Sequence, residues 1–208
     1  MILDEALAVC PVVAILRGVR PDEVLEVTQR LYAEGLRAVE VPLNSPEPFE
    51  SIRRLCDAFG ERMACGAGTV LSPEMVDLAA DAGARIIIAP NTDPLVIGRA
   101  VALGLEPAPG FASPSEAFLA LASGARHLKL FPAATYGPGH IRQLKAVLPA
   151  RAVVWAVGGV GASRLAEFWE AGVRAFGIGS EIYRPGQTPQ TTAERARELA
   201  AAAQALPR

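Results

Sequence analysis

Residues 123–130 read SGARHLKL, a glycine followed shortly by an apolar run, and this pattern decides the fold. It recurs at 34–41 (EGLRAVEV), 82–89 (AGARIIIA) and 171–178 (AGVRAFGI). A glycine at the end of a helix can adopt the positive φ of a C-cap, and the apolar, β-rich run after it is typical of a buried strand. The repeat therefore predicts a chain of alternating helices and strands.

Eight such apolar runs alternate with helical patterns along the chain. They lie at 12–16, 38–41, 63–67, 85–88, 105–108, 127–131, 153–157 and 175–178. Strands separated by helices pair in parallel. Because no G-x-G-x-x-G fingerprint follows the first strand, closure into a (β/α)8 TIM barrel is favoured over an open doubly wound sheet. The 208 residues fit one such α/β domain, spanning 1–208.

The helices carry their own start signals. First-turn prolines are expected at Pro21, Pro73, Pro94 and Pro114, with Ser72, Asp93 and Ser113 as N-caps before three of them. A last helix is predicted over 191–206, opened by a capping box of Thr191 and Glu194.

Composition narrows the class of partner. The formal net charge is -2, with 51% hydrophobic and 20% charged residues, which is typical of a globular protein without the basic surface that binds nucleic acid or anionic membranes. The longest apolar run, 6–16, contains Pro11 and follows two acidic residues, so it reads as neither a membrane span nor a signal peptide. We expect a cytoplasmic protein with a small-molecule partner.

Metal and disulfide chemistry find little support in the sequence. Cys10, Cys56 and Cys65 are odd in number and lack C-x-x-C spacing, which predicts packed, reduced thiols. His127 and His140 are the only histidines, too few for a histidine-rich zinc site. The sequence therefore predicts no metal site and no disulfide framework.

Lys129 is the strongest candidate for covalent chemistry. It is one of only two lysines and lies inside an apolar predicted strand, whereas Lys145 falls on a helix where a solvated position explains it. A free lysine has a pKa of about 10.4, and a nucleophilic amine at neutral pH needs about 7–8. Apolar burial lowers the pKa of an amine, so Lys129 could attack a ketone. The structural alternative is a buried stem whose ammonium snorkels or pairs with a carboxylate.

Glu40 and Arg17 are expected near the same end of the barrel. The period of two places Glu40 opposite Val39 and Val41, which directs it to the barrel interior. Apolar surroundings would raise its pKa toward neutrality, as suits a proton shuttle; the alternative is a salt bridge with Arg17 or Lys129. Arg17 ends the first strand and could hold a substrate carboxylate bidentately, or else form a rim ion pair.

Glycines follow three of the predicted strands. Thr69 stands in 66–69 (GAGT), where backbone donors and a hydroxyl can approach a ligand, although alone this signal is weak. The clusters 157–160 (VGGV) and 177–180 (GIGS) follow the seventh and eighth strands, where many barrels bind phosphate through backbone N–H groups. Tolerance of glycine in tight turns is the structural alternative.

Taken in order, five motifs resemble those of the 2-keto-3-deoxy-6-phosphogluconate and -galactonate aldolase family, over nearly the whole chain. They are 15–18 (ILRG), 39–42 (VEVP), 66–70 (GAGTV), 128–132 (LKLFP) and 157–160 (VGGV). The segments 41–45 (VPLNS) and 155–159 (WAVGG) look more like the phosphogalactonate branch, because gluconate enzymes carry threonine where Val157 stands.

The resemblance implies a class I aldolase that reversibly cleaves a phosphorylated keto-deoxy sugar acid to pyruvate and D-glyceraldehyde 3-phosphate, without a cofactor. It implies that Lys129 forms the Schiff base, Glu40 moves protons, and Arg17 and Thr69 hold the substrate carboxylate. Phe131 and Val157 would line the pocket, and the phosphate would bind Gly158, Gly159, Gly179 and Ser180. Family members are typically homotrimers.

Three alternatives stay open on the residues alone. The substrate could be the gluconate epimer. A phosphate-binding barrel could instead run isomerase, epimerase or decarboxylase chemistry, with Lys129 as a non-covalent electrostatic group. A sugar-phosphate sensor would account for the glycine clusters but not for burying both Lys129 and Glu40.

Overall fold

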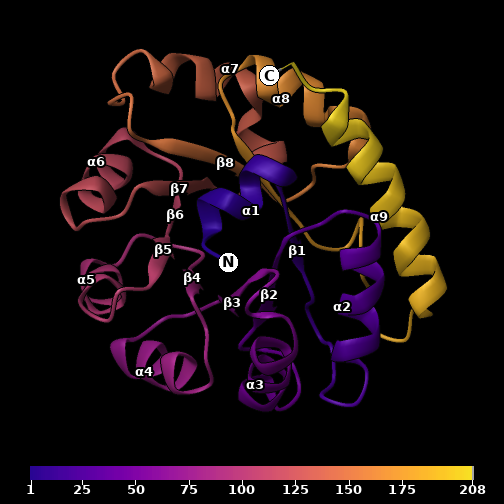
Figure 1. The fold of residues 1–208 in the computed structure, drawn as a ribbon. Helices are drawn as coiled ribbons and strands as arrows, with labels where there is room; N and C mark the ends of the chain where they lie inside the picture. Colours follow the sequence, from indigo (N-terminus) through magenta and orange to yellow (C-terminus); the bar gives the residue numbers. More distant parts are fainter. Residues whose placement is uncertain (208) are drawn as a thin grey trace.

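A computed structural model describes residues 1–207 as a ring of parallel strands surrounded by helices (Figure 1). The strands are β1 (Val12–Ile15), β2 (Ala38–Pro42), β3 (Ala64–Gly68), β4 (Ile86–Ile88), β5 (Glu106–Ala108), β6 (Gly110–Phe111), β7 (His127–Leu130), β8 (Val153–Val157) and β9 (Ala175–Ile178). The helices are α1 (Leu3–Val9), α2 (Val24–Ala33), α3 (Pro48–Phe59), α4 (Pro73–Asp81), α5 (Pro94–Ala102), α6 (Pro114–Ala122), α7 (Ala133–Lys145), α8 (Leu165–Glu170) and α9 (Pro189–Gln204), with a 3-10 turn, η1 (Ala162–Arg164), before α8. The predicted barrel is confirmed.

The barrel closes through its fifth strand. The strand order is β5-β4-β3-β2-β1-β9-β8-β7-β6, so the two edges of the sheet, β5 and β6, are separated by Pro109 alone. The Lys129 N–H donates to the Pro109 carbonyl (2.9 Å), and the Phe131 N–H donates to the Phe111 carbonyl (3.2 Å). The run predicted at 105–108 contains β5, whereas the two-residue strand β6 was not predicted; Pro109, which has no N–H to contribute to the ladder, separates the two strands.

Most helix starts agree with the sequence. Ser72, Asp93 and Ser113 are N-caps whose side chains accept backbone N–H groups, and a proline follows each of them in the first turn. Pro21 is an exception, because α2 begins only at Val24 and Pro21 lies in the turn before it.

The last helix begins earlier than predicted. Thr188 is its N-cap, with a hydroxyl that accepts the Thr191 N–H at 3.2 Å, and Pro189 is its first residue. The predicted capping box of Thr191 and Glu194 is therefore wrong, because a threonine followed by proline is the stronger start signal.

The strands divide their side chains between two apolar layers. Val39 and Val41 point outward and pack under the helices, whereas Val13 and Ile15 belong to the barrel interior. Helix α1, which the sequence did not predict, crosses one end of the barrel and adds Leu3 to that interior layer (Figure 1). This end is packed, which leaves the opposite end, where the strands finish, for a ligand.

Polar contacts also fix the packed end. Buried His127 accepts a hydrogen bond from Trp155 Nε1 (3.1 Å), and its other ring nitrogen lies 3.4 Å from the Asp4 carboxylate of α1. Burial and the neighbouring Arg126 lower the pKa of His127 to about 4. His127 is therefore a neutral structural residue, as its packed position in the sequence suggests.

Within residues 1–207, none of the helices has the length and apolar character needed to cross a membrane.

Candidate active site

A cavity of about 150 Å³ opens at the carboxyl ends of the strands. All the candidate residues predicted from the sequence line it: Arg17, Glu40, Thr69, Lys129, Phe131, Val157, Gly158, Gly159, Gly179 and Ser180. They come from six of the strands or from the loops that follow them, and the barrel brings them together because parallel strands all finish at the same rim.

Lys129 points into the barrel from the middle of β7. Its neighbours Leu128 and Leu130 pack outward under the helices, so the alternation of the strand directs Lys129 inward, and its side chain is only 6% exposed. Burial lowers the pKa of Lys129, and Arg17 acts in the same direction, while Glu40 opposes both. The Nζ atom lies 5.1 Å from the centre of the Phe131 ring. An amine in these surroundings has a larger neutral, nucleophilic fraction at pH 7 than a surface lysine.

Glu40 reaches the same cavity from β2 and is 3% exposed. Burial raises its pKa to about 7, against the opposing charges of Lys129 and Arg17. No ion pair involves Glu40 within residues 1–207, and its Oε2 atom is buried without a hydrogen-bond partner among them. The alternative of a structural salt bridge with Arg17 or Lys129 therefore finds no support.

Gly68 makes room for the Glu40 carboxylate. A Cβ atom at Gly68 would overlap the Glu40 carboxyl group, and a Cβ at Gly66 would overlap the backbone of Ile86. The sequence predicts these glycines only as points where a ligand can approach the backbone. Their contacts show a different need, space for a side chain from one neighbouring strand and for the backbone of the other, which only strand pairing reveals.

Arg17 and Thr69 stand at the mouth. Arg17 is exposed, and its Nη1 atom donates to the Asn44 side-chain oxygen at 2.6 Å. Thr69 has φ 58°, a left-handed conformation that is unfavourable for a β-branched residue. Strain of this kind persists where the surroundings impose it and concentrates at functional sites. The loop after β3 thus holds Thr69 at the cavity in a conformation it would not adopt alone.

The glycines after β8 have a packing role of their own. Gly158 and Gly159 have φ of 94° and 69°, and a Cβ atom at Gly159 would come within 2.6 Å of the Ala134 side chain. The Ala134 N–H donates to the Gly158 carbonyl at 3.0 Å. The glycine pair therefore packs tightly against the start of α7, and this close packing forms one wall of the cavity.

The loop after β9 contributes Gly179, Ser180 and Glu181 to the cavity, and of these only Glu181 was not predicted from the sequence. The Gly179 carbonyl accepts the N–H groups of Ile182 and Tyr183, which makes a tight turn at the rim. Glu181 comes directly after Gly179 and Ser180 in the sequence, and this position is the one feature from which its place in the cavity could have been predicted. Across residues 1–207, no group of three or more His, Cys, Asp or Glu side chains is arranged to hold a metal ion.

A family model described as "Aldolase: KDPG and KHG aldolase" matches residues 3–194. The chain belongs to this aldolase family. It is 47% identical to the 2-dehydro-3-deoxy-6-phosphogalactonate aldolase of Escherichia coli, over 89% of this chain and 91% of that one. The protein is accordingly an aldolase, and therefore a lyase, as the motifs of the sequence imply.

Solved structures agree with the family. A structure described as "Native KDPGal structure" superposes with a TM-score of 0.92 at 46% identity, covering 93% of this chain and 94% of that one. A KDPG aldolase from Legionella pneumophila, with pyruvate captured as a covalent carbinolamine, gives a TM-score of 0.83 at 25% identity, covering 94% and 96%. The aldolase fold is thus common to this chain and to both structures.

Proposed function

We propose that this aldolase reversibly cleaves 2-keto-3-deoxy-6-phosphogalactonate to pyruvate and D-glyceraldehyde 3-phosphate through a Schiff base on Lys129. The observation that carries the proposal is the burial of a lysine and a carboxylate in one cavity with opposite pKa shifts. An amine shifted toward neutrality and an acid with a pKa of about 7 can exchange protons with a substrate at neutral pH.

Lys129 begins the reaction as the nucleophile. Its neutral Nζ adds to the C2 ketone carbon to give a carbinolamine, and loss of water gives a protonated iminium. The electrons of the C3–C4 bond then flow into the iminium, while the C4 hydroxyl loses its proton and becomes the aldehyde of glyceraldehyde 3-phosphate. Protonation of the resulting enamine at C3, followed by hydrolysis, releases pyruvate and the free amine.

Glu40 serves as the proton carrier in this sequence. As a carboxylate it accepts the proton of the C4 hydroxyl, and as the acid it returns a proton to C3. A pKa of about 7 keeps both forms accessible, and the Oε2 atom is not engaged by another described residue. The proposed reaction needs neither a metal nor an organic cofactor.

The remaining residues bind the two ends of the substrate. Arg17 and Thr69 hold the carboxylate beside the carbonyl, and Phe131 covers the reacting carbons. Backbone N–H groups of the loops after β8 and β9 bind the phosphate. They belong to Gly158, Gly159, Gly179 and Ser180.

Val157 sets the preference for the galactonate epimer in this proposal. It ends β8, lines the cavity and is almost fully buried. The two candidate substrates differ only in the direction of the C4 hydroxyl, and valine supplies bulk there without a hydrogen bond. The gluconate epimer is the alternative substrate.

A borohydride trap tests the covalent step. Incubation with pyruvate and sodium borohydride should add a stable pyruvate-derived mass to residue 129, with loss of activity, because reduction fixes the iminium. The Lys129→Arg variant should take up no label, and Lys145→Arg should be labelled like the wild type. Labelling at Lys145 instead, or full activity in Lys129→Arg, would refute Lys129 as the nucleophile, and a wild type that takes up no label would favour a non-covalent isomerase or epimerase.

We also propose a cytoplasmic homotrimer, as the resemblance implies. Large apolar side chains are exposed on the neighbouring helices α4, α5 and α6, and such a surface is typical of a protein contact.

A further inference from the structure

Arg17, at the mouth of the cavity, has an uncharged partner. Its Nη1 atom donates to the Asn44 Oδ1 atom at 2.6 Å, and within residues 1–207 no carboxylate forms an ion pair with it. Arg17 is exposed, so its charge faces the solvent at the point where a substrate would enter. A guanidinium without an ion-pair partner is available to attract an incoming anion.

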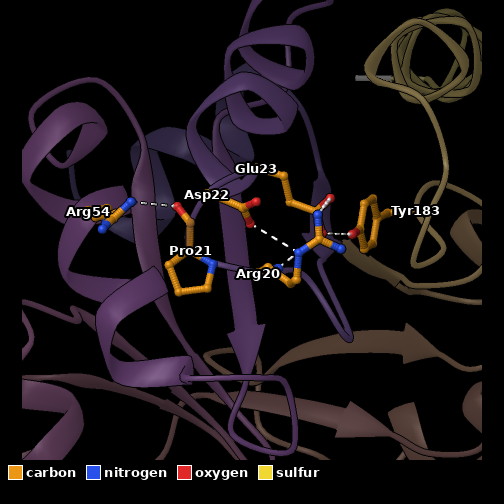
Figure 2. A network of polar contacts seen from close by, with 6 residues as sticks. All are labelled: Arg20, Pro21, Asp22, Glu23, Arg54 and Tyr183. Carbon is orange, nitrogen blue, oxygen red and sulfur yellow. Dashed lines mark hydrogen bonds and ion pairs between the residues drawn. The ribbon is translucent and has the colours of Figure 1, made fainter.

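Arg20, three residues after Arg17 in the same loop, forms ion pairs with carboxylates (Figure 2). Its guanidinium pairs with Asp22 at 3.1 Å and with Glu23 at 3.4 Å, and Glu23 also accepts the Tyr183 hydroxyl at 2.8 Å. The charge of Arg20 is therefore balanced by carboxylates, whereas Arg17 is bound by an uncharged amide, that of Asn44.

The loop that carries Asn44 is itself fixed to the loop of Arg17. Buried Ser45 accepts the Gly18 N–H at 2.9 Å through its hydroxyl, and the Ser45 N–H donates to the Pro42 carbonyl at 2.9 Å. Two consecutive residues after β2 thus bind two consecutive residues after β1. This pair of contacts places the Asn44 amide at a set position beside the Arg17 guanidinium.

We propose that Asn44 is a positioning residue: it orients Arg17 toward the substrate carboxylate without consuming its charge. The proposal rests on the proposed function of Arg17. A guanidinium has five N–H donors, and the Asn44 contact uses only one, so a complete fork remains for a bidentate carboxylate. A carboxylate at residue 44 would hold the same geometry but would compete with the substrate for that fork.

The test compares Asn44→Asp with Asn44→Ala. The readouts are the pyruvate concentration that half-saturates borohydride trapping at Lys129, and KM and kcat for cleavage. Asn44→Ala should raise the half-saturating concentration about 3–10-fold, because Arg17 loses its orienting hydrogen bond. Asn44→Asp, which is nearly isosteric, should raise it by about 10-fold or more, because it cancels the charge. For both variants kcat should stay within about twofold, because saturating substrate still occupies the site.

Two controls separate orientation from general effects. Asn91→Asp adds the same charge to another exposed loop that follows a strand and should change the half-saturating concentration by less than about twofold, since Arg17 donates its side-chain hydrogen bond to Asn44 and not to residue 91. In an Arg17→Ala background, Asn44→Asp should have no further effect, because the two residues act through one interaction. Thermal unfolding of each variant checks that the fold is kept.

The outcomes distinguish this inference from the function it rests on. If Arg17→Ala weakens pyruvate trapping but Asn44→Asp behaves like the wild type, or like Asn91→Asp, the role of Asn44 is overturned and the function stands. The role is likewise overturned if Asn44→Asp weakens trapping equally with and without Arg17. If Arg17→Ala traps pyruvate as the wild type does, both assignments fall, and if the wild type traps no pyruvate, the Schiff-base function falls first.

Discussion

Glu40 and Lys129 illustrate, at the scale of single residues, how one apolar environment acts on opposite charges. Burial disfavours the charged form of each, so it raises the pKa of the acid to about 7 and lowers that of the amine. Their mutual attraction opposes both shifts but is smaller than the effect of burial. The two side chains are thereby brought toward the pH at which proton transfer in both directions is fast.

Replacing Glu40 by glutamine should separate binding from proton transfer. Glu40→Gln keeps the size and most of the polarity of the side chain, so pyruvate trapping at Lys129 should survive. Turnover should fall by about 10²–10⁴-fold, the usual effect of losing a positioned acid or base. Steady-state kinetics beside trapping measures both, and near-normal turnover would leave Glu40 with a structural role only.

The same variant has a predicted effect on stability against pH. Because the folded-state pKa of Glu40 is raised above its ordinary value, folding binds a proton, and this group's stabilising contribution is lost as the pH rises through about 7. Glu40→Gln does not titrate, so its stability relative to wild type should increase by about 3 kcal/mol between pH 4 and pH 8, because the pKa of Glu40 is raised from 4.5 to about 7 and each pKa unit is worth about 1.4 kcal/mol. Urea unfolding at both pH values tests this, and a pH-independent difference would contradict the raised pKa.

Val157 carries the prediction about substrate choice. Val157→Thr adds a hydroxyl at the wall of the cavity and should shift the ratio of kcat/KM toward the gluconate epimer by about 1–3 kcal/mol, or roughly 10–200-fold. The wild type should prefer the galactonate epimer. An unchanged ratio would make Val157 a packing residue of β8, and a wild-type preference for the gluconate epimer would refute the branch assignment while leaving Lys129 untouched.

The candidate residues were predictable because they follow two simple rules. Alternation along β2 and β7 directs Glu40 and Lys129 inward, and the barrel places every loop after a strand at one rim. Gly68 and Asn44 were missed because their importance lies in contacts with other strands and loops. Gly68 leaves space for the Glu40 carboxylate on β2, and Asn44 binds the Arg17 guanidinium after β1. Neither contact can be predicted from the residues next to it in the sequence.

At the scale of elements, strands were easier to predict than their ends. The runs at 153–157 and 175–178 agree with β8 and β9 at both ends, and the run at 105–108 contains β5, whereas the short strand β6 after Pro109 was not predicted. Helix α1 escaped prediction because it is short and its apolar residues merge into the run that contains β1. Both differences concern the chain's tertiary pairing: proline interrupts a ladder, and α1 is held by the barrel end that it covers.

The start of α9 gives a prediction at this scale. Thr188→Ala should lower the free energy of unfolding by about 1 kcal/mol, since the hydroxyl that accepts the Thr191 N–H is lost. Thr191→Ala, the matched control inside the helix, should cost less than about 0.5 kcal/mol. Denaturant unfolding of the two variants distinguishes the observed cap from the capping box expected from sequence, and the reverse order would restore the latter.

In the whole molecule, one end of the barrel is closed by packed side chains and the other end holds the cavity. The α1 end is filled by apolar side chains and by the contacts of His127 with Trp155 and Asp4. The opposite end holds a cavity in which the buried Glu40 Oε2 atom has no hydrogen-bond partner among residues 1–207. Packing at one end supplies the rigidity that holds Lys129 and Glu40 in place at the other.

The outer surface bears on assembly. Large apolar side chains are exposed on or directly beside three consecutive helices, α4, α5 and α6, which pack side by side around the barrel (Figure 1). They are Leu71, Leu78, Leu95, Val101, Leu103, Phe118 and Leu119. Water contact with so many neighbouring apolar groups is unfavourable, and covering them with a second copy removes that cost. This face is therefore where we expect subunits of the proposed homotrimer to meet.

Leu95, which is 71% exposed at the start of α5, is the position to test. Light scattering of the wild type should give three times the chain mass of 21.8 kDa. Leu95→Asp places a charge in the expected interface and should shift the protein toward the single-chain mass, because a charge is costly where no partner meets it. Leu25→Asp on α2, also an exposed leucine, should leave the assembly intact. A wild type of single-chain mass would refute the trimer, and a trimer that tolerates Leu95→Asp would move the interface to another face of the barrel.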